Sequence, residues 1–155
     1  MAQVGKSVGR TNEITTVSKI KPGLTLPLRA FLDVSAGRLL NKVLENIETI
    51  HYACWMIVPM NGRDYLVFIS NYTGSFEKYI DDFGSVLTLA LGLEVIWSFC
   101  EDWPGIDSID DLKAFIRRTT SNASFYYSAY PDATVRDVLK GLRATTVVQE
   151  LFDLA

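Results

Sequence analysis

The residue pair Asn61-Gly62 most constrains the fold, because it separates two runs rich in β-forming side chains, at 50–59 and 65–72. Asn and Gly tolerate the positive φ angles of a two-residue turn, whose twist matches that of paired antiparallel strands. The pattern therefore predicts a β-hairpin. With these two residues as the loop, the predicted cross-strand pairs are Met60 with Arg63, Ile57 with Leu66, Trp55 with Phe68, Ala53 with Ser70, and His51 with Tyr72.

Side chains alternate between the two faces of a strand, so the hairpin register sorts them into two sets. One set is aliphatic, and we predict that it packs beneath helices: Val58, Met56, Cys54, Val67 and Ile69. The other set mixes aromatic and polar side chains, and we predict that it forms the uncovered face: His51, Trp55, Phe68, Ser70 and Tyr72. A one-residue slip of the turn would change the cross-strand pairs but not the alternation within each strand.

The flanking segments predict the remaining elements of an α+β domain. Period-2 alternation predicts strands at 13–20 and 122–130, and apolar residues at helical spacing predict helices at 27–47 and 76–91. The resulting order, β-α-β-β-α-β, is that of a ferredoxin-like fold, an antiparallel sheet with helices on one face. The other face of such a sheet needs a cover if it is apolar, which makes it a site of association.

Two further helices and a leader are predicted outside this core order. Ser108 and Asp111 begin a helical insertion with a capping-box-like pattern. Thr134 and Asp137 cap a C-terminal helix that runs to the end of the chain. Residues 1–12 are polar and lack periodicity, so we predict a flexible leader ahead of a single domain at 13–155.

Composition restricts the partners and the compartment. Of the 155 residues, 48% are hydrophobic and 12% aromatic, which excludes a largely disordered chain, and the longest apolar run is too short to cross a bilayer. A net charge of −3 provides no basic surface, so we expect neither a nucleic-acid partner nor a membrane. Two cysteines without a signal-peptide pattern predict a cytoplasmic protein. One histidine and two distant cysteines lack metal-site spacing, so we predict no metal, and without a dinucleotide-binding glycine fingerprint we predict no cofactor.

His51 is the only histidine, and its side chain has the only unperturbed pKa near neutrality. Beside the phenol of Tyr72 it is a candidate general base, and these two residues are the predicted catalytic pair. The predicted substrate-binding residues on the same face are Trp55, Phe68, Ser70, Tyr126 and Tyr130. Two alternatives remain open: His51 only holds a strand end, and the tyrosines pack in a dimer interface.

The segments Ile-His-Tyr-Ala-Cys-Trp at 50–55 and Ser-Asn-Tyr-Thr-Gly-Ser at 70–75, with the predicted element order, resemble the dimeric α+β barrel superfamily. The resemblance is closer to a bacterial group of stand-alone domains with a His-aromatic-Ala-x-Trp strand and a Ser-Asn-Tyr-x-Gly segment, and it extends over about 13–153. It implies a homodimer in which two sheets pack face to face. Where that group often has arginine this chain has Cys54, so any role of the arginine is missing here.

The superfamily includes cofactor-independent monooxygenases of polycyclic phenols, polyketide cyclases, small isomerases and haem enzymes. The resemblance therefore implies a small-molecule enzyme that acts on an aromatic or polyketide-like substrate in a pocket between sheet and helices. One alternative is a haem-binding, peroxidase-like protein, although haem members hold iron with a histidine outside the sheet and His51 is expected within a strand. Another is a non-catalytic ligand-binding or dimerisation module.

Overall fold

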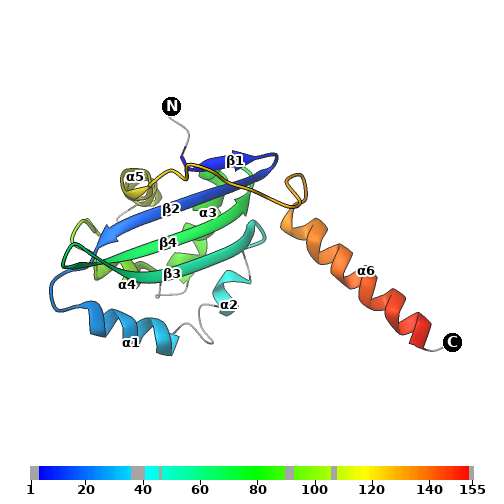
Figure 1. Cartoon of the computed structure of the whole chain (residues 1–155), viewed down its shortest axis with the longest axis horizontal. Coiled ribbons are helices and arrows are strands. Elements are labelled where there is room, and N and C mark those ends of the chain that lie inside the picture. Colours follow the sequence, from blue (N-terminus) through cyan, green and yellow to red (C-terminus); the bar gives the residue numbers. More distant parts are fainter. Residues whose placement is uncertain (1–3, 36–40, 46, 90–92, 106–107, 154–155) are drawn as a thin grey trace.

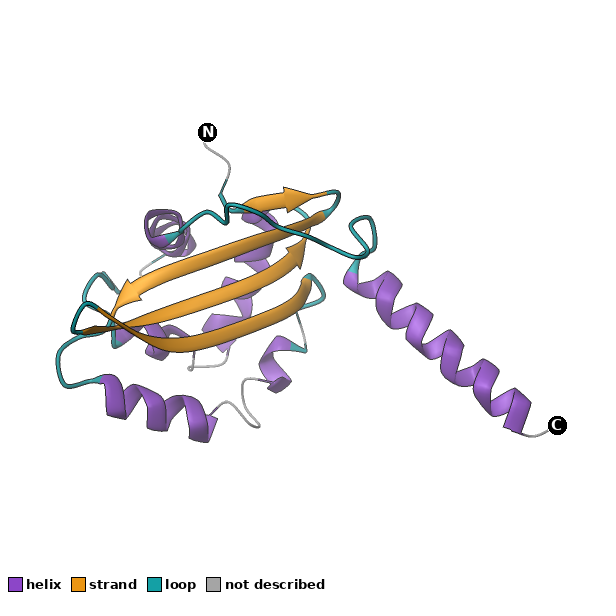
Figure 2. Ribbon diagram, in the orientation of Figure 1, coloured by secondary structure: helices purple, strands orange, loops and turns teal. Residues whose placement is uncertain are grey.

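A computed structural model describes residues 4–35, 41–45, 47–89, 93–105 and 108–153. The described part is α+β, with a four-stranded antiparallel sheet at its centre (Figures 1 and 2). The strands are β1 (Lys6–Val8), β2 (Thr11–Lys19), β3 (Ile50–Met60) and β4 (Arg63–Thr73), in the spatial order β1-β2-β4-β3.

Helices cover one face of this sheet. α3 (Phe76–Leu89), α4 (Leu93–Ser98) and α5 (Ile109–Thr119) lie behind it in Figure 1, while α1 (Thr25–Ser35) and α2 (Asn41–Leu44) flank the β3 edge. The last helix, α6 (Val135–Asp153), projects away from the rest. Part of the predicted helix at 27–47, residues 36–40 and 46, lies outside the described residues. No helix in the described ranges combines the length and the apolar character that a membrane crossing requires.

The hairpin prediction is confirmed. Asn61 and Gly62 both have positive φ, 51° and 74°, as a two-residue turn of this type requires. The cross-strand pairs are the predicted ones as far as Ala53 and Ser70. The pairing then shifts by one residue, so that Ile50, not His51, lies opposite Tyr72. His51 is therefore the extra residue of a β-bulge.

The predicted assignment of the two sheet faces is wrong. The aromatic set lies under the helices, where Phe68 packs edge-on against Trp97 at 5.5 Å between ring centroids and Tyr72 stacks on Tyr79 at 4.2 Å. The helices contribute large aromatic side chains of their own, so packing these against the aromatic face of the sheet buries the most apolar area. The aliphatic set instead occupies the uncovered face: Cys54 and Met56 are exposed, and Val58, Val67 and Ile69 are half-buried.

The fourth strand also differs from the prediction. Residues 122–130 form an extended segment without strand pairing, and the edge beside β2 is taken by β1, within the predicted leader. A tight turn joins β1 to β2 through Gly9, whose φ is +60° and where a Cβ would lie 2.7 Å from the Pro131 carbonyl oxygen. With this edge occupied by β1, the chain after α5 makes only an isolated bridge to β2, between Thr120 and Thr16. The described order of elements is therefore not β-α-β-β-α-β.

The new face assignment predicts unequal costs for two truncations of similar size. Leu66→Ala, at a fully buried position, should lower the free energy of unfolding by about 2–5 kcal/mol. Met56→Ala, at a side chain 38% exposed on the other face, should cost less than about 1 kcal/mol. Urea unfolding followed by tryptophan fluorescence measures both. The opposite ranking would mean that the helices cover the aliphatic face.

Candidate functional site

His51 owes its position to the bulge. Its Nε2 lies 2.6 Å from Thr73 Oγ1, a hydrogen bond whose donor depends on the imidazole tautomer. Thr73 follows Tyr72 in β4, so strand alternation places it on the face opposite the aromatic core. The bulge thus turns the half-buried imidazole away from Trp55 and the helical layer.

Tyr130 contacts the imidazole of His51 on the uncovered side of the sheet. The two rings are 5.9 Å apart, and the Tyr130 hydroxyl hydrogen-bonds the hydroxyl of Tyr52 at 3.1 Å. This bond raises the pKa of Tyr130. The extended segment is fixed next to this residue, where Arg10 N donates to the Pro131 carbonyl at 2.8 Å. Tyr130 is therefore anchored both to β3 and to the β1–β2 turn.

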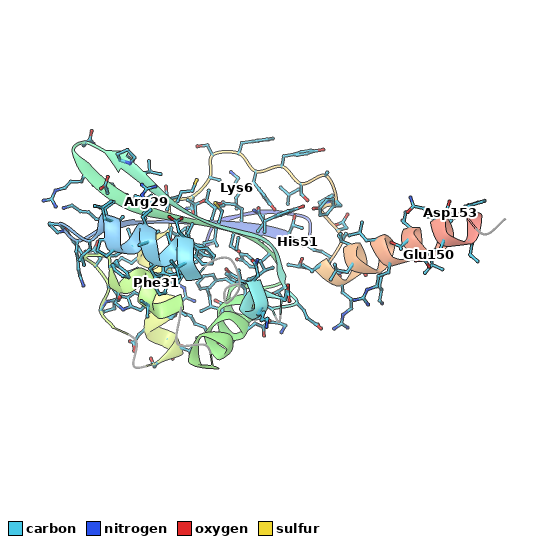
Figure 3. The ribbon with its side chains drawn as sticks, turned by 90° about the horizontal axis from the view of Figure 1, so that it is seen from below. Lys6, Arg29, Phe31, His51, Glu150 and Asp153 are labelled. Atoms are coloured by element: carbon cyan, nitrogen blue, oxygen red, sulfur yellow. The ribbon has the colours of Figure 1, made fainter. Side chains whose placement is uncertain are left out.

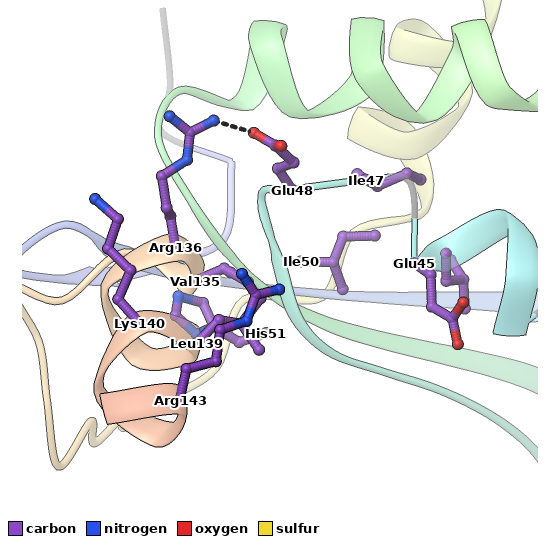
Figure 4. A pocket seen from close by; sticks show the side chains of 11 residues that line it. Glu45, Ile47, Glu48, Ile50, His51, Val135, Arg136, Leu139, Lys140 and Arg143 are labelled. Atoms are coloured by element: carbon purple, nitrogen blue, oxygen red, sulfur yellow. Dashed lines mark hydrogen bonds and ion pairs between the residues drawn. The ribbon is translucent and has the colours of Figure 1, made fainter. Parts of the chain in front are cut away.

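A groove of about 660 Å³ opens beside His51 (Figure 4). Its size is in the range of small-molecule sites, which span about 300–1,000 Å³. One wall comes from α2 and the start of β3, and the other from the first half of α6: Leu44, Glu45, Ile47, Glu48, Ile50, His51, Val135, Arg136, Leu139, Lys140 and Arg143. The apolar side chains offer a surface for a hydrophobic ligand body.

The α6 wall of the groove is basic. Arg136, Lys140 and Arg143 recur at spacings of four and three residues and so share one side of the helix. Arg136 pairs with Glu48 across the groove, as Figure 4 shows, but both side chains are largely exposed, so the pair adds little stability. Arg143 extends over the groove toward His51 in the same view. This wall suits a ligand that carries or develops negative charge.

Burial lowers the pKa of His51 below its ordinary value of 6.5. The imidazole is therefore neutral at pH 7. If Nε2–H donates to Thr73 Oγ1, Nδ1 carries the lone pair and can accept a proton. The arrangement can thus serve as a general base next to an apolar groove with a cationic wall.

The predicted site residues fall into two groups. His51 lines the groove, Tyr130 contacts the His51 ring without lining the groove, and Tyr126 is half-buried earlier in the same extended segment. The other four residues, Trp55, Phe68, Ser70 and Tyr72, lie on the helix-covered face and fill the core there. Tyr72 is only 1% exposed, and burial raises its pKa well above the ordinary value, so it is not a partner for His51.

Sequence reasoning did not find Thr73, Glu48 or the α6 cations as parts of the site. Thr73 lies beside His51 only because of the bulge, and no residue pattern marks that irregularity. The spacing of Arg136, Lys140 and Arg143 is visible in the sequence. Such a set is also typical of a solvated helix face, so the spacing alone does not identify a groove.

The residues at His51 do not suit an axial haem ligand. Nε2, the nitrogen at the ring tip that would have to face the iron, is instead hydrogen-bonded to Thr73 Oγ1. Among the described residues, no three His, Cys, Asp or Glu side chains gather in a way that could hold a metal ion. Comparisons with protein-family models, curated proteins and solved structures gave no match.

Because His51 is the only histidine, its titration can be followed without assignment. We expect the NMR titration of its ring signals to have a midpoint below 6.5, because burial disfavours the imidazolium. Tyr130→Ala should move the midpoint back toward 6.5 by admitting water, whereas Tyr127→Ala, at an exposed side chain of the same segment, should not. A wild-type midpoint at or above 6.5 would contradict this account.

The same shift sets the sign of a stability effect. The unfolded chain binds a proton at His51 more readily than the folded chain, so the free energy of unfolding should fall as pH falls below about 6.5. The stability from neutral His51 is fully present above that pH. Urea titrations of wild type and His51→Gln should therefore diverge between pH 7.5 and 5. Parallel curves would mean that the imidazole has the same pKa in both states.

Proposed function

We propose that this chain is a small-molecule enzyme of the cofactor-independent kind, acting on an aromatic or polyketide-like substrate in the groove beside His51. The observation that carries the proposal is the neutral, half-buried imidazole at a groove of about 660 Å³. The segments at 50–55 and 70–75, which resemble dimeric α+β barrel enzymes, support the substrate class, whereas the element order of that superfamily is not the one described. The pocket proposed now lies between the start of β3 and α6, not between the sheet and its helical layer.

The chemistry that the groove supports is proton transfer. His51 Nδ1 takes an acidic proton from a phenol or from a carbon next to a carbonyl group, which leaves a phenolate or an enolate. The basic wall, with Arg143 over the groove, stabilises the developing negative charge. In an isomerisation or a cyclisation the imidazolium then returns the proton, so that His51 is neutral again at the end of the cycle.

The apolar lining positions the substrate, and Tyr130 supports the His51 ring. Ile47, Ile50 and Leu139 offer surface to a fused ring system, and Tyr130 presents an aromatic ring beside the imidazole. An acidic aromatic molecule would thus have its rings among these side chains and its ionisable group near His51.

A second candidate is a non-catalytic ligand-binding module. The bond between His51 Nε2 and Thr73 favours it, because this is the contact of a histidine that simply fixes a strand end. In this case the groove binds its ligand through the apolar lining and the α6 cations, and the imidazole takes no proton.

Binding and turnover of two probes, anthrone and 2-naphthol, test the proposal and separate the two candidates. We expect both probes to shift the His51 ring signals, and the proton at anthrone C10 to exchange with deuterated solvent under catalysis. His51→Gln should lower the exchange rate by about 10²-fold or more. Ser124→Ala, at an exposed residue that does not line the groove, is the matched control and should leave the rate unchanged.

Binding of the probes with equal exchange rates in wild type and His51→Gln would contradict the catalytic proposal and leave the ligand-binding module. Absence of any binding, with His51 signals unmoved by both probes, would contradict the groove as a site for this substrate class.

A further inference from the structure

The groove beside His51 carries a local excess of positive charge. Its charged lining residues are three cations and two acids: Arg136, Lys140, Arg143, Glu45 and Glu48. With His51 neutral, these side chains give the lining a net charge of +1. The chain as a whole has a net charge of −3, so the sign at the groove is opposite to that of the protein. Such a local reversal attracts an anion to this place and not to the surface in general.

The protein itself pairs one of the three cations. Arg136 makes an ion pair with Glu48 across the groove. Lys140 and Arg143 make no ion pair with any described residue. Asp137, the one acid in the first half of α6, instead caps the start of the helix. Lys140 and Arg143 are therefore the cations that remain for a ligand.

The position of α6 adds to this positive potential. Val135 and Arg136, its first two residues, line the groove, so the positive end of the helix dipole borders it. Figure 4 shows Arg143 extending over the groove toward His51, whereas Glu45 lies on the opposite wall. Arg143 is thus the cation best placed to contact a ligand that also reaches the imidazole.

We propose that the ligand of this groove is an apolar molecule with one carboxylate, and that Arg143 binds this carboxylate. A planar guanidinium donates two parallel hydrogen bonds to a carboxylate, which the ammonium group of a lysine does not. Lys140 supports the contact through its charge. The apolar body of the ligand lies along Ile47, Ile50 and Leu139.

The charges of the groove favour a ligand with a single negative charge. A carboxylate neutralises the net charge of +1 of the lining, whereas a phosphate monoester, with a charge of about −1.5 to −2 at pH 7, exceeds it. Glu45 makes no ion pair with a described residue, so its carboxylate repels the additional charge. Glu45 is thus a specificity-determining residue that disfavours a phosphorylated ligand.

This inference rests on the proposed function for the place of the site but not for its chemistry. Proton transfer needs His51 as a base, whereas carboxylate binding needs Arg143 and Lys140 and occurs without turnover. The inference adds a permanent charge to a substrate that the proposed reaction requires only to have an acidic proton. Binding and hydrogen exchange therefore test the two separately.

Three naphthalene probes with one ring system and different charges test the inference: 2-naphthol, 2-naphthoate and 2-naphthyl phosphate. At pH 7.5 the first is neutral, the second is singly negative and the third is close to doubly negative. NMR titration of the His51 ring signals gives their dissociation constants. We expect 2-naphthoate to bind at least about fivefold more tightly than either other probe in 20 mM NaCl, and its advantage over 2-naphthol to fall below about twofold in 0.5 M NaCl.

Substitutions of the full-length chain assign the effect to residues. Arg143→Gln should remove most of the advantage of 2-naphthoate, and Arg143→Lys should restore only part of it, because the charge returns without the paired hydrogen bonds. Glu45→Gln should tighten the binding of 2-naphthyl phosphate at least about threefold and leave that of 2-naphthol unchanged. Circular dichroism confirms that each variant keeps its fold.

Arg29→Gln is the matched control, because it removes the same charge from the chain at an exposed position outside the groove. Figure 3 shows Arg29 on α1, away from His51 and from α6. This variant should leave all three dissociation constants unchanged. An equal loss of 2-naphthoate binding in Arg29→Gln and Arg143→Gln would overturn the assignment to the groove.

Equal binding of 2-naphthoate and 2-naphthol would overturn the inference and leave the proposed function standing. Tighter binding of 2-naphthyl phosphate than of 2-naphthoate would overturn the single carboxylate. The expected preference for 2-naphthoate, without exchange of the anthrone proton, would support this inference and contradict the proposed catalysis. Failure of all three probes to bind would overturn both.

Discussion

The aromatic packing between the sheet and its helices decides what every other part of the molecule can do. Trp97 contacts Phe68 and Trp55 on the sheet and Phe115 on α5, so one cluster joins β3, β4, α4 and α5. Because these large side chains need the helical cover, the opposite face of the same strands is left open. The groove forms at one end of the sheet, between the chain from Leu44 to His51 and the first half of α6.

The bulge in β3 sets His51 apart from this core. Without the extra residue, alternation would carry position 51 onto the face of Ala53 and Trp55, beneath the helices. With it, the imidazole bonds Thr73, meets Tyr130 and borders the groove. The position of the His51 ring and its protonation state are linked, because the partial burial of the ring lowers its pKa and so favours the neutral form. The proposed role as a base depends on both.

Local patterns were enough to predict the hairpin, its register to Ala53 and the capped starts of α5 and α6. They act over a few residues, and Asn61-Gly62 or Thr134 with Asp137 specify their geometry nearly alone. The choice of covered face was not predictable in this way, since it depends on Tyr79, Trp97 and Phe115 arriving from distant helices. The short β1 escaped prediction because its stability comes from an edge of β2 that no other strand had filled.

The orientation of the sheet is the central claim, and thiol reactivity of the native protein tests it most directly. Cys54 lies exposed on the open face, while Cys100 is fully buried and burial raises its pKa to about 12. A thiol reagent such as 5,5′-dithiobis(2-nitrobenzoate) should modify one cysteine rapidly at pH 8 and the second only after unfolding. Cys54→Ser should abolish the rapid phase. Protection of Cys54 in a monomeric sample, or a rapid phase that survives Cys54→Ser, would show that the helices cover the other face.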